Sequence, residues 1–276
     1  EYQTMNIPGG ISVPGAELLL RVRALAPDPA TQVIVNCAGR TRGLIGTQSL
    51  RNAGIPNPVA ALRNGTIGWT LAGFELERAQ ARRFDATAPV APADLAAARA
   101  AAQSLATRAG AQRLSAGALD TLDTLDTLEG PGRTVYRLDV RSPEEHAAGH
   151  LAGFISAPGG QLVQETDVFA PVRGARIVLT DGWGDSAGVR APMTAHWLAQ
   201  MGWDVAWLDG TADDRFASRF DQTGAVPPPP ARSPHRYRRP YEGTDNPHAA
   251  MQAYLDWEFG LVAQLGRDAT HGFRVL

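Results

Sequence analysis

A single cysteine lies between an apolar run and two arginines in the stretch VIVNCAGRTRG, residues 33–43. Cys37 follows the apolar run, and Arg40 and Arg42 come shortly after it. A thiolate is a strong nucleophile, and nearby guanidinium groups favour the thiolate over the thiol. The same positive charges attract small anions. This spacing therefore predicts a nucleophilic Cys37 in a site for an anionic substrate.

The residues on either side of Cys37 predict how such a site would be built. VIVN is typical of a buried strand, and GLIGTQSLRNAG, from Gly43, is typical of a helix closed by glycine. A loop that leads from a strand into a helix turns its N–H groups inward, where they form a concavity for an anion. Gly39 permits turns that other residues resist. The residues expected to bind the substrate are Ala38, Gly39, Arg40, Thr41 and Arg42.

The unreactive alternative is that Cys37 is a small buried hydrophobe and that the two arginines are solvated loop charges. The cysteine-to-arginine spacing, the glycine within it and the strand–loop–helix context favour the reactive thiol. Arg42 has the stronger claim of the two arginines, because a second copy of this segment has Arg190 at the matching position.

That second copy lies at a nearly constant offset along the chain. Adding 144 to each residue number aligns IPGGISVPGAEL, from Ile7, with LAGFISAPGGQL, from Leu151. The same offset places Cys37 over Asp181, and a short insertion then shifts the match to Arg42 over Arg190. A carboxylate has no thiol sulfur to react and would repel an anionic substrate. We therefore expect the second copy to be catalytically silent.

The second copy begins with VYRLDVRSPEE, residues 135–145, which reads as a strand followed by a helix start with Ser142 as N-cap. We expect Asp139, Arg141 and Glu145 to form a structural ion-pair network. The alternative is a different pocket in this copy, lined by Trp183 and Asp185. The counterpart of the strand would fall before residue 1, so the first copy is expected to lack its N-terminal segment.

The repeat predicts an α/β chain in four parts. An alanine-rich run from Pro92 favours a helix, TLDTLDTLE at 121–129 favours solvated surface or a short helix, and TDNPHAAMQAYLDWEFGLVAQLGRD favours an amphipathic helix packed on a domain. The expected parts are an α/β domain over 1–80, a helical linker over 81–131, an α/β domain over 132–222, and a proline-rich linker with a C-terminal helix over 223–276.

The composition limits the classes of binding partner and the cellular compartment that we expect for this protein. The 276 residues carry a formal net charge of −2, which argues against a nucleic-acid partner or an anionic membrane. One cysteine cannot form an internal disulfide, so we expect a reducing compartment, the cytoplasm. No apolar run is long enough to span a bilayer. His146 and His150 lack further metal ligands and are expected on a solvated helix face, so we expect no metal and no cofactor.

Taken together, the motifs resemble the rhodanese (sulfurtransferase) superfamily over residues 1–79 and 133–210. The motifs that carry the resemblance are LDVRSPEEHAAGHLAGFISAP, IPGGISVPGAEL, CAGRTRG and LRNGTIGW. The resemblance implies two rhodanese-like domains, each a mainly parallel sheet flanked by helices. It also implies that Cys37 takes sulfane sulfur from a thiosulfate-like donor as a persulfide, held by the loop N–H groups, and passes it to cyanide, a thiol or a protein acceptor.

Two other functions stay open from the sequence. Cysteine-dependent phosphatases use a loop one residue longer, in which the arginine would fall at position 43, but that residue is Gly43. The spacing therefore favours sulfur chemistry, although arsenate reduction on a similar loop is an alternative. The second is a non-catalytic rhodanese-like module with a binding or regulatory role, which the silent second copy supports.

Overall fold

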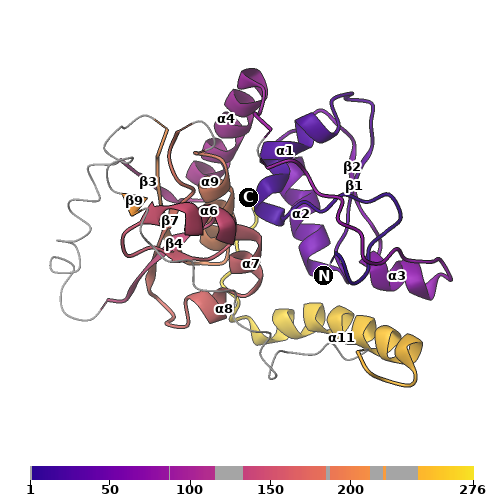
Figure 1. Ribbon diagram of the computed structural model, residues 1–276. Coiled ribbons are helices and arrows are strands. Elements are labelled where there is room, and N and C mark those ends of the chain that lie inside the picture. Colours follow the sequence, from indigo (N-terminus) through magenta and orange to yellow (C-terminus); the bar gives the residue numbers. More distant parts are fainter. Residues whose placement is uncertain (1, 87, 116–132, 185–186, 212–219, 222–241) are drawn as a thin grey trace.

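In the computed structural model the two copies of the repeat lie side by side, and a long C-terminal helix runs beneath them (Figure 1). Helix α4 stands between the copies in the same view. The structure describes residues 2–86, 88–115, 133–184, 187–211, 220–221 and 242–276. The predicted surface segment 121–129 and the proline-rich linker lie outside these residues.

The second copy forms a parallel sheet that, within the described residues, has five strands in the order β3-β8-β7-β4-β6. Helices flank the sheet, and its core contains the buried residues Leu138, Ile177, Leu179, Leu198 and Trp207. The strands are β3 (Gln112–Leu114), β4 (Val135–Asp139), β6 (Ile155–Ser156), β7 (Arg176–Thr180) and β8 (Asp204–Leu208). The helices are α6 (Pro143–Ala148), α7 (Gly159–Gln164), α8 (Thr166–Phe169) and α9 (Arg190–Gln200), and a short antiparallel pair joins β5 (His150–Leu151) to β9 (Phe220–Asp221).

The first copy also alternates strands and helices along the chain, but its sheet is smaller. In this sheet β1 (Val33–Val35) pairs in parallel with β2 (Val59–Ala61). The prediction that VIVN is buried is wrong, because Ile34 is 57% exposed. Its counterpart β7 has a strand on each side, whereas within the described residues β1 pairs with β2 alone. The helical elements are η1 (Gly15–Glu17), α1 (Leu18–Leu25), α2 (Thr41–Asn52) and α3 (Gly65–Leu71).

Helix α4 (Pro92–Arg108) confirms the helix predicted from Pro92, and it fills the space between the copies. Its buried face shares one apolar cluster with Leu20 and Leu50 of the first copy and Met193 of the second. The segment after it forms β3, which pairs with β8 of the second sheet. The division at residue 132 stays a prediction, but β3 extends the second sheet to the N-terminal side of that position.

A buried ion cluster also connects the two copies. Arg190 is 1% exposed and donates to Glu17 of the first copy at 2.6 Å and to Glu145 of the second at 2.8 and 2.9 Å. Burial alone would lower the pKa of Arg190, but the two carboxylates outweigh it and raise that pKa. Glu145 in turn belongs to a capping box with Ser142, which confirms the predicted N-cap. Removing one partner would leave a buried charge unpaired.

The C-terminal helix α11 (Pro247–Asp268) is packed on the first copy, which confirms the predicted packing on a domain. The apolar spacing that predicted it also included Trp257 and Leu265, which are exposed. Met251 and Leu255 are buried against Ile67 of α3. None of the helices in the described ranges has the length and apolarity that crossing a bilayer would require.

One buried histidine makes the stability of this fold depend on pH. His196 on α9 is fully buried, its Nδ1 donates to the carbonyl of Met193, and its Nε2 has no hydrogen-bond partner among the described residues. Burial lowers the pKa of His196 to about 4, whereas an unfolded histidine titrates near 6.5. The neutral ring therefore contributes its full stability above about pH 6.5 and loses it as pH falls toward 4.

We predict that the free energy of unfolding of the wild type falls by about 2 kcal/mol more between pH 7.5 and 4.5 than that of H196Q. Urea unfolding at the two pH values measures this difference. The control is H248Q, because His248 is exposed and its loss should leave the wild-type pH dependence unchanged. If the free energy of unfolding depended on pH equally in H196Q and the wild type, the effect could not be assigned to His196.

Candidate active site at the Cys37 loop

Cys37 lies where the sequence predicts, in the loop between the carboxyl end of β1 and the start of α2. The thiol is free and half-buried. The N–H group of Gly43, in the first turn of α2, donates to its Sγ at 3.2 Å. The sulfur therefore faces the amino end of α2, where the helix dipole stabilises negative charge.

The amino end of α3 holds the loop from the opposite side. The N–H groups of Thr66 and Ile67 donate to the carbonyls of Cys37 at 3.0 Å and Ala38 at 2.9 Å, and the Thr66 hydroxyl also donates to Ala38. A trans peptide group points its N–H opposite to its carbonyl. The N–H groups of Ala38 and Gly39 consequently point away from α3, which is the orientation an anion site in this loop needs.

Gly65 allows this close contact between α3 and the loop. Its φ is +57°, and a Cβ there would lie 2.1 Å from the Cys37 carbonyl oxygen and 2.5 Å from that of Gly39. No side chain fits in that space. In the sequence, LRNGTIGW contributed only to a resemblance, and this role of Gly65 was not predicted. The pair Asn64-Gly65, typical of a tight turn, was the signal available.

Helix α11 covers the next three residues of the loop. A Cβ on the buried Gly39 would lie 3.3 Å from Tyr254 and 3.4 Å from the Glu258 carboxylate. The guanidinium of Arg40 stacks over the Phe259 ring, 3.8 Å from its centroid, and the Thr41 hydroxyl lies 3.5 Å from Glu258. Arg42 is half-buried in the first turn of α2. The structure thus brings the predicted residues together and adds α11 to them.

The matching loop of the second copy holds a carboxyl group of its own. The fully buried Asp181 carboxylate accepts the N–H groups of Gly188 at 3.0 Å, Val189 at 2.9 Å and Ala191 at 3.1 Å. Ala191 is the counterpart of Gly43, so the same backbone position donates to the Asp181 carboxylate in one copy and to the Cys37 thiol in the other. Burial raises the pKa of Asp181, opposed by Arg190 and these three N–H groups.

The other polar residues singled out in the second copy are structural. Arg141 pairs with Asp139, as predicted, and donates to the Gly149 carbonyl at 2.7 Å. Glu145 does not join this pair as the predicted network would require, but pairs with Arg190. Asp185, part of the alternative pocket, lies outside the described residues. The prediction of one solvated helix face for His146 and His150 is wrong. The two rings are half-buried and stacked 4.0 Å apart, and His150 belongs to β5 because α6 ends at Ala148.

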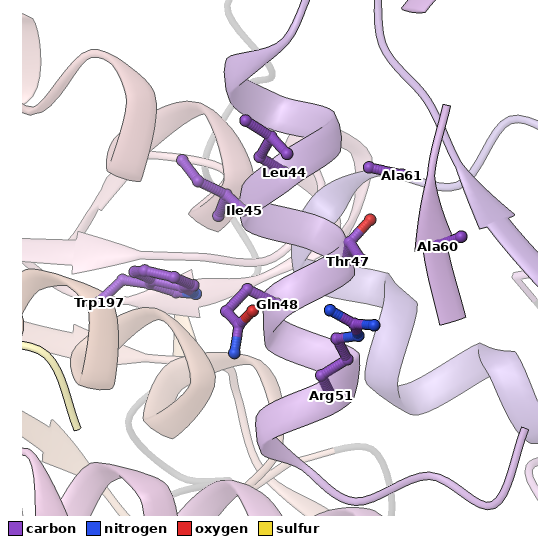
Figure 2. A pocket seen from close by; sticks show the side chains of 8 residues that line it. All are labelled: Leu44, Ile45, Thr47, Gln48, Arg51, Ala60, Ala61 and Trp197. Carbon is purple, nitrogen blue, oxygen red and sulfur yellow. The ribbon is translucent and has the colours of Figure 1, made fainter. Parts of the chain in front are cut away.

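A separate hollow of about 420 Å³ lies between α2, β2 and α9 (Figure 2). Its wall is built mostly from apolar side chains, and the Trp197 indole closes one side while donating to the Ser49 hydroxyl at 2.8 Å. Cys37 is not part of the wall. The lining residues are Leu44, Ile45, Thr47, Gln48, Arg51, Ala60, Ala61 and Trp197.

Comparison with known proteins places this geometry in a family. No family model matches the chain, and no curated protein matches it. The crystal structure of a thiosulfate sulfurtransferase from Pseudomonas aeruginosa is 43% identical, has a TM-score of 0.84, and aligns with 100% of this chain and 71% of that one. A 3-mercaptopyruvate sulfotransferase of rhodanese fold from Escherichia coli is 20% identical over 77% of this chain and 85% of that one. Its TM-score is 0.29.

We predict that G65A destabilises the protein far more than G54A. Both glycines have positive φ, but a Cβ at Gly54 meets nothing within 4 Å. G54A should therefore cost about 1 kcal/mol for its backbone conformation, whereas G65A should cost about 3 kcal/mol or more because the loop must move. Chemical denaturation measures both. Hydrogen exchange should quicken at Thr66 and Ile67 in G65A only, and equal effects of the two variants would contradict the packing role.

Proposed function

The chain belongs to the thiosulfate sulfurtransferase (rhodanese) family and is a rhodanese-like transferase, and on that basis we propose that Cys37 carries sulfane sulfur between a donor and an acceptor. The donor would be thiosulfate or a similar small anion. The acceptor would be cyanide, a small thiol or a protein thiol. The single cysteine agrees with a reducing compartment, and the cytoplasm stays our prediction.

In the first step the Cys37 thiolate attacks the outer sulfur of thiosulfate. A bond forms between Sγ and that sulfur while the bond from the outer sulfur to the sulfonate breaks, and sulfite leaves with the electron pair. The product is the anionic persulfide Cys37–S–S⁻. The N–H groups of the loop, from Ala38 to Arg42, would hold this charge as fixed dipoles. The side chains of Arg40 and Arg42 would orient the donor or the departing sulfite.

In the second step the acceptor attacks the outer sulfur of the persulfide. A new bond forms between the acceptor and that sulfur, the S–S bond to Cys37 breaks, and its electron pair returns to Sγ. Thiocyanate or an acceptor persulfide leaves, and Cys37 is again a thiolate. Covalent catalysis of this kind divides one difficult transfer into two easier ones.

The proposal rests on one hydrogen bond that recurs in the Cys37 loop and in the matching Asp181 loop. In the second copy the Ala191 N–H group donates to the Asp181 carboxylate, and in the first copy the equivalent Gly43 N–H group donates to Cys37 Sγ. The loop conformation thus suits a negative charge at the position of the sulfur. The second copy, with its loop already occupied by its own carboxylate, would be silent in catalysis.

We predict that the protein gains the mass of one sulfur atom when it is mixed with thiosulfate, and that C37S gains none. Mass spectrometry of the intact protein measures the gain, and cyanide should remove it with release of thiocyanate. D181N is the matched control in the other loop and should gain sulfur as the wild type does. An unchanged mass in folded wild type would favour a non-catalytic module, and release of phosphate from an aryl phosphate would favour the phosphatase alternative.

A further inference from the structure

Helix α11 places a carboxylate against the loop that surrounds Cys37. The Glu258 carboxylate lies beside Gly39 and Thr41, which are on either side of Arg40. The Tyr254 hydroxyl donates to its Oε1 at 2.9 Å and so fixes its orientation. A carboxylate held at this position places negative charge beside the loop that surrounds Cys37.

One oxygen of that carboxylate lacks a hydrogen-bond partner among the described residues. Glu258 Oε2 is buried, and no group in the described part of the chain donates a hydrogen bond to it. The described residues also provide no ion pair for Glu258. A buried carboxylate oxygen without a donor is costly, and a cationic group bound near the carboxylate would offset part of that cost.

Arg40, which lies between the two loop residues beside Glu258, also contacts α11. The guanidinium of Arg40 stacks on Phe259, the residue after Glu258, so α11 engages Arg40 through an aromatic ring. The loop N–H groups act on the transferred sulfur itself, whereas Glu258 acts on whatever the acceptor carries beyond its sulfur. The loop N–H groups would therefore favour a negative charge on the sulfur, whereas Glu258 would favour a positive charge elsewhere on the acceptor.

We propose that Glu258, oriented by Tyr254, is a specificity-determining residue that makes the Cys37 persulfide prefer acceptor thiols bearing a cationic amine over thiols bearing a carboxylate. The inference rests on the proposed function and deepens it by naming the acceptor class. In the selected step, R–S⁻ attacks the outer sulfur of Cys37–S–S⁻, R–S–S⁻ leaves, and Cys37 returns to the thiolate. Charge and sulfur balance without another reactant.

The test measures discharge of the preformed persulfide by three acceptors: cysteamine, 2-mercaptoethanol and mercaptoacetate. Protein is loaded with thiosulfate, freed of excess donor, and mixed with each thiol, and the second-order rate constant of sulfur loss is recorded. The quantity compared between variants is the ratio of the cysteamine and mercaptoacetate rate constants. Differences in the intrinsic reactivity of the thiols cancel, because every variant meets the same acceptors.

We predict that E258Q lowers this ratio by about fivefold at low ionic strength, because it removes one charge close to the acceptor. The rate with the neutral 2-mercaptoethanol should change little. D256N is the matched control: Asp256 is on the same helix, is exposed, and accepts from Gln252, so its loss should leave the ratio at the wild-type value. Y254F should lower the ratio by a smaller factor, because the charge stays but its orientation is lost.

A merely structural role for Glu258 would slow all three acceptors alike and leave the ratio unchanged. That result, with persulfide forming normally in E258Q, would overturn the inference and leave the proposed function intact. An equal fall of the ratio in D256N would also overturn it, because the effect would then come from net charge. Failure of the wild type to take up sulfur at all would instead refute the proposed function, and the selectivity with it.

Discussion

The candidate site depends on how two peptide groups are turned. The amino end of α3 binds the carbonyls of Cys37 and Ala38, and this contact directs the following N–H groups away from α3. Without it the loop would be an ordinary strand-to-helix connection, free to present carbonyl oxygens to the sulfur and to repel an anion. The lack of a side chain at Gly65 makes the contact possible. The proposed chemistry at Cys37 therefore depends on a helix that begins well after it in the chain.

The two loops of this chain place different groups within one backbone arrangement. Where the first copy has a thiol, the second has a carboxylate that satisfies three N–H groups by itself. Arg190, whose counterpart Arg42 lies at the candidate site, has become the centre of an ion cluster with Glu17 and Glu145. Backbone N–H groups and an arginine that suit an external anion can instead bind carboxylates of the same chain, and they then stabilise the fold.

Local sequence patterns were enough to predict much of this architecture. The Cys37 loop, the helices α2, α4, α9 and α11 and the Ser142 cap all have signals within a few residues of themselves. The exposure of β1, the clamp formed by α3 and the packing of α11 on the loop did not follow from such signals. Each depends on which distant segments meet: Thr41 and Glu258 are 217 positions apart. Periodicity and capping describe one element at a time, so contacts of this kind need the assembled fold.

The cation buried between the copies has a consequence for how the molecule can be divided. Pulling the halves apart would strip Glu17 from Arg190 and open the apolar cluster around α4. Within the described residues, the copy that carries Cys37 has only the small β1–β2 sheet, so its stability depends on these contacts with the second copy. The second copy, which we propose to be catalytically silent, supports the first copy through these contacts, and that support would give selection a reason to retain it.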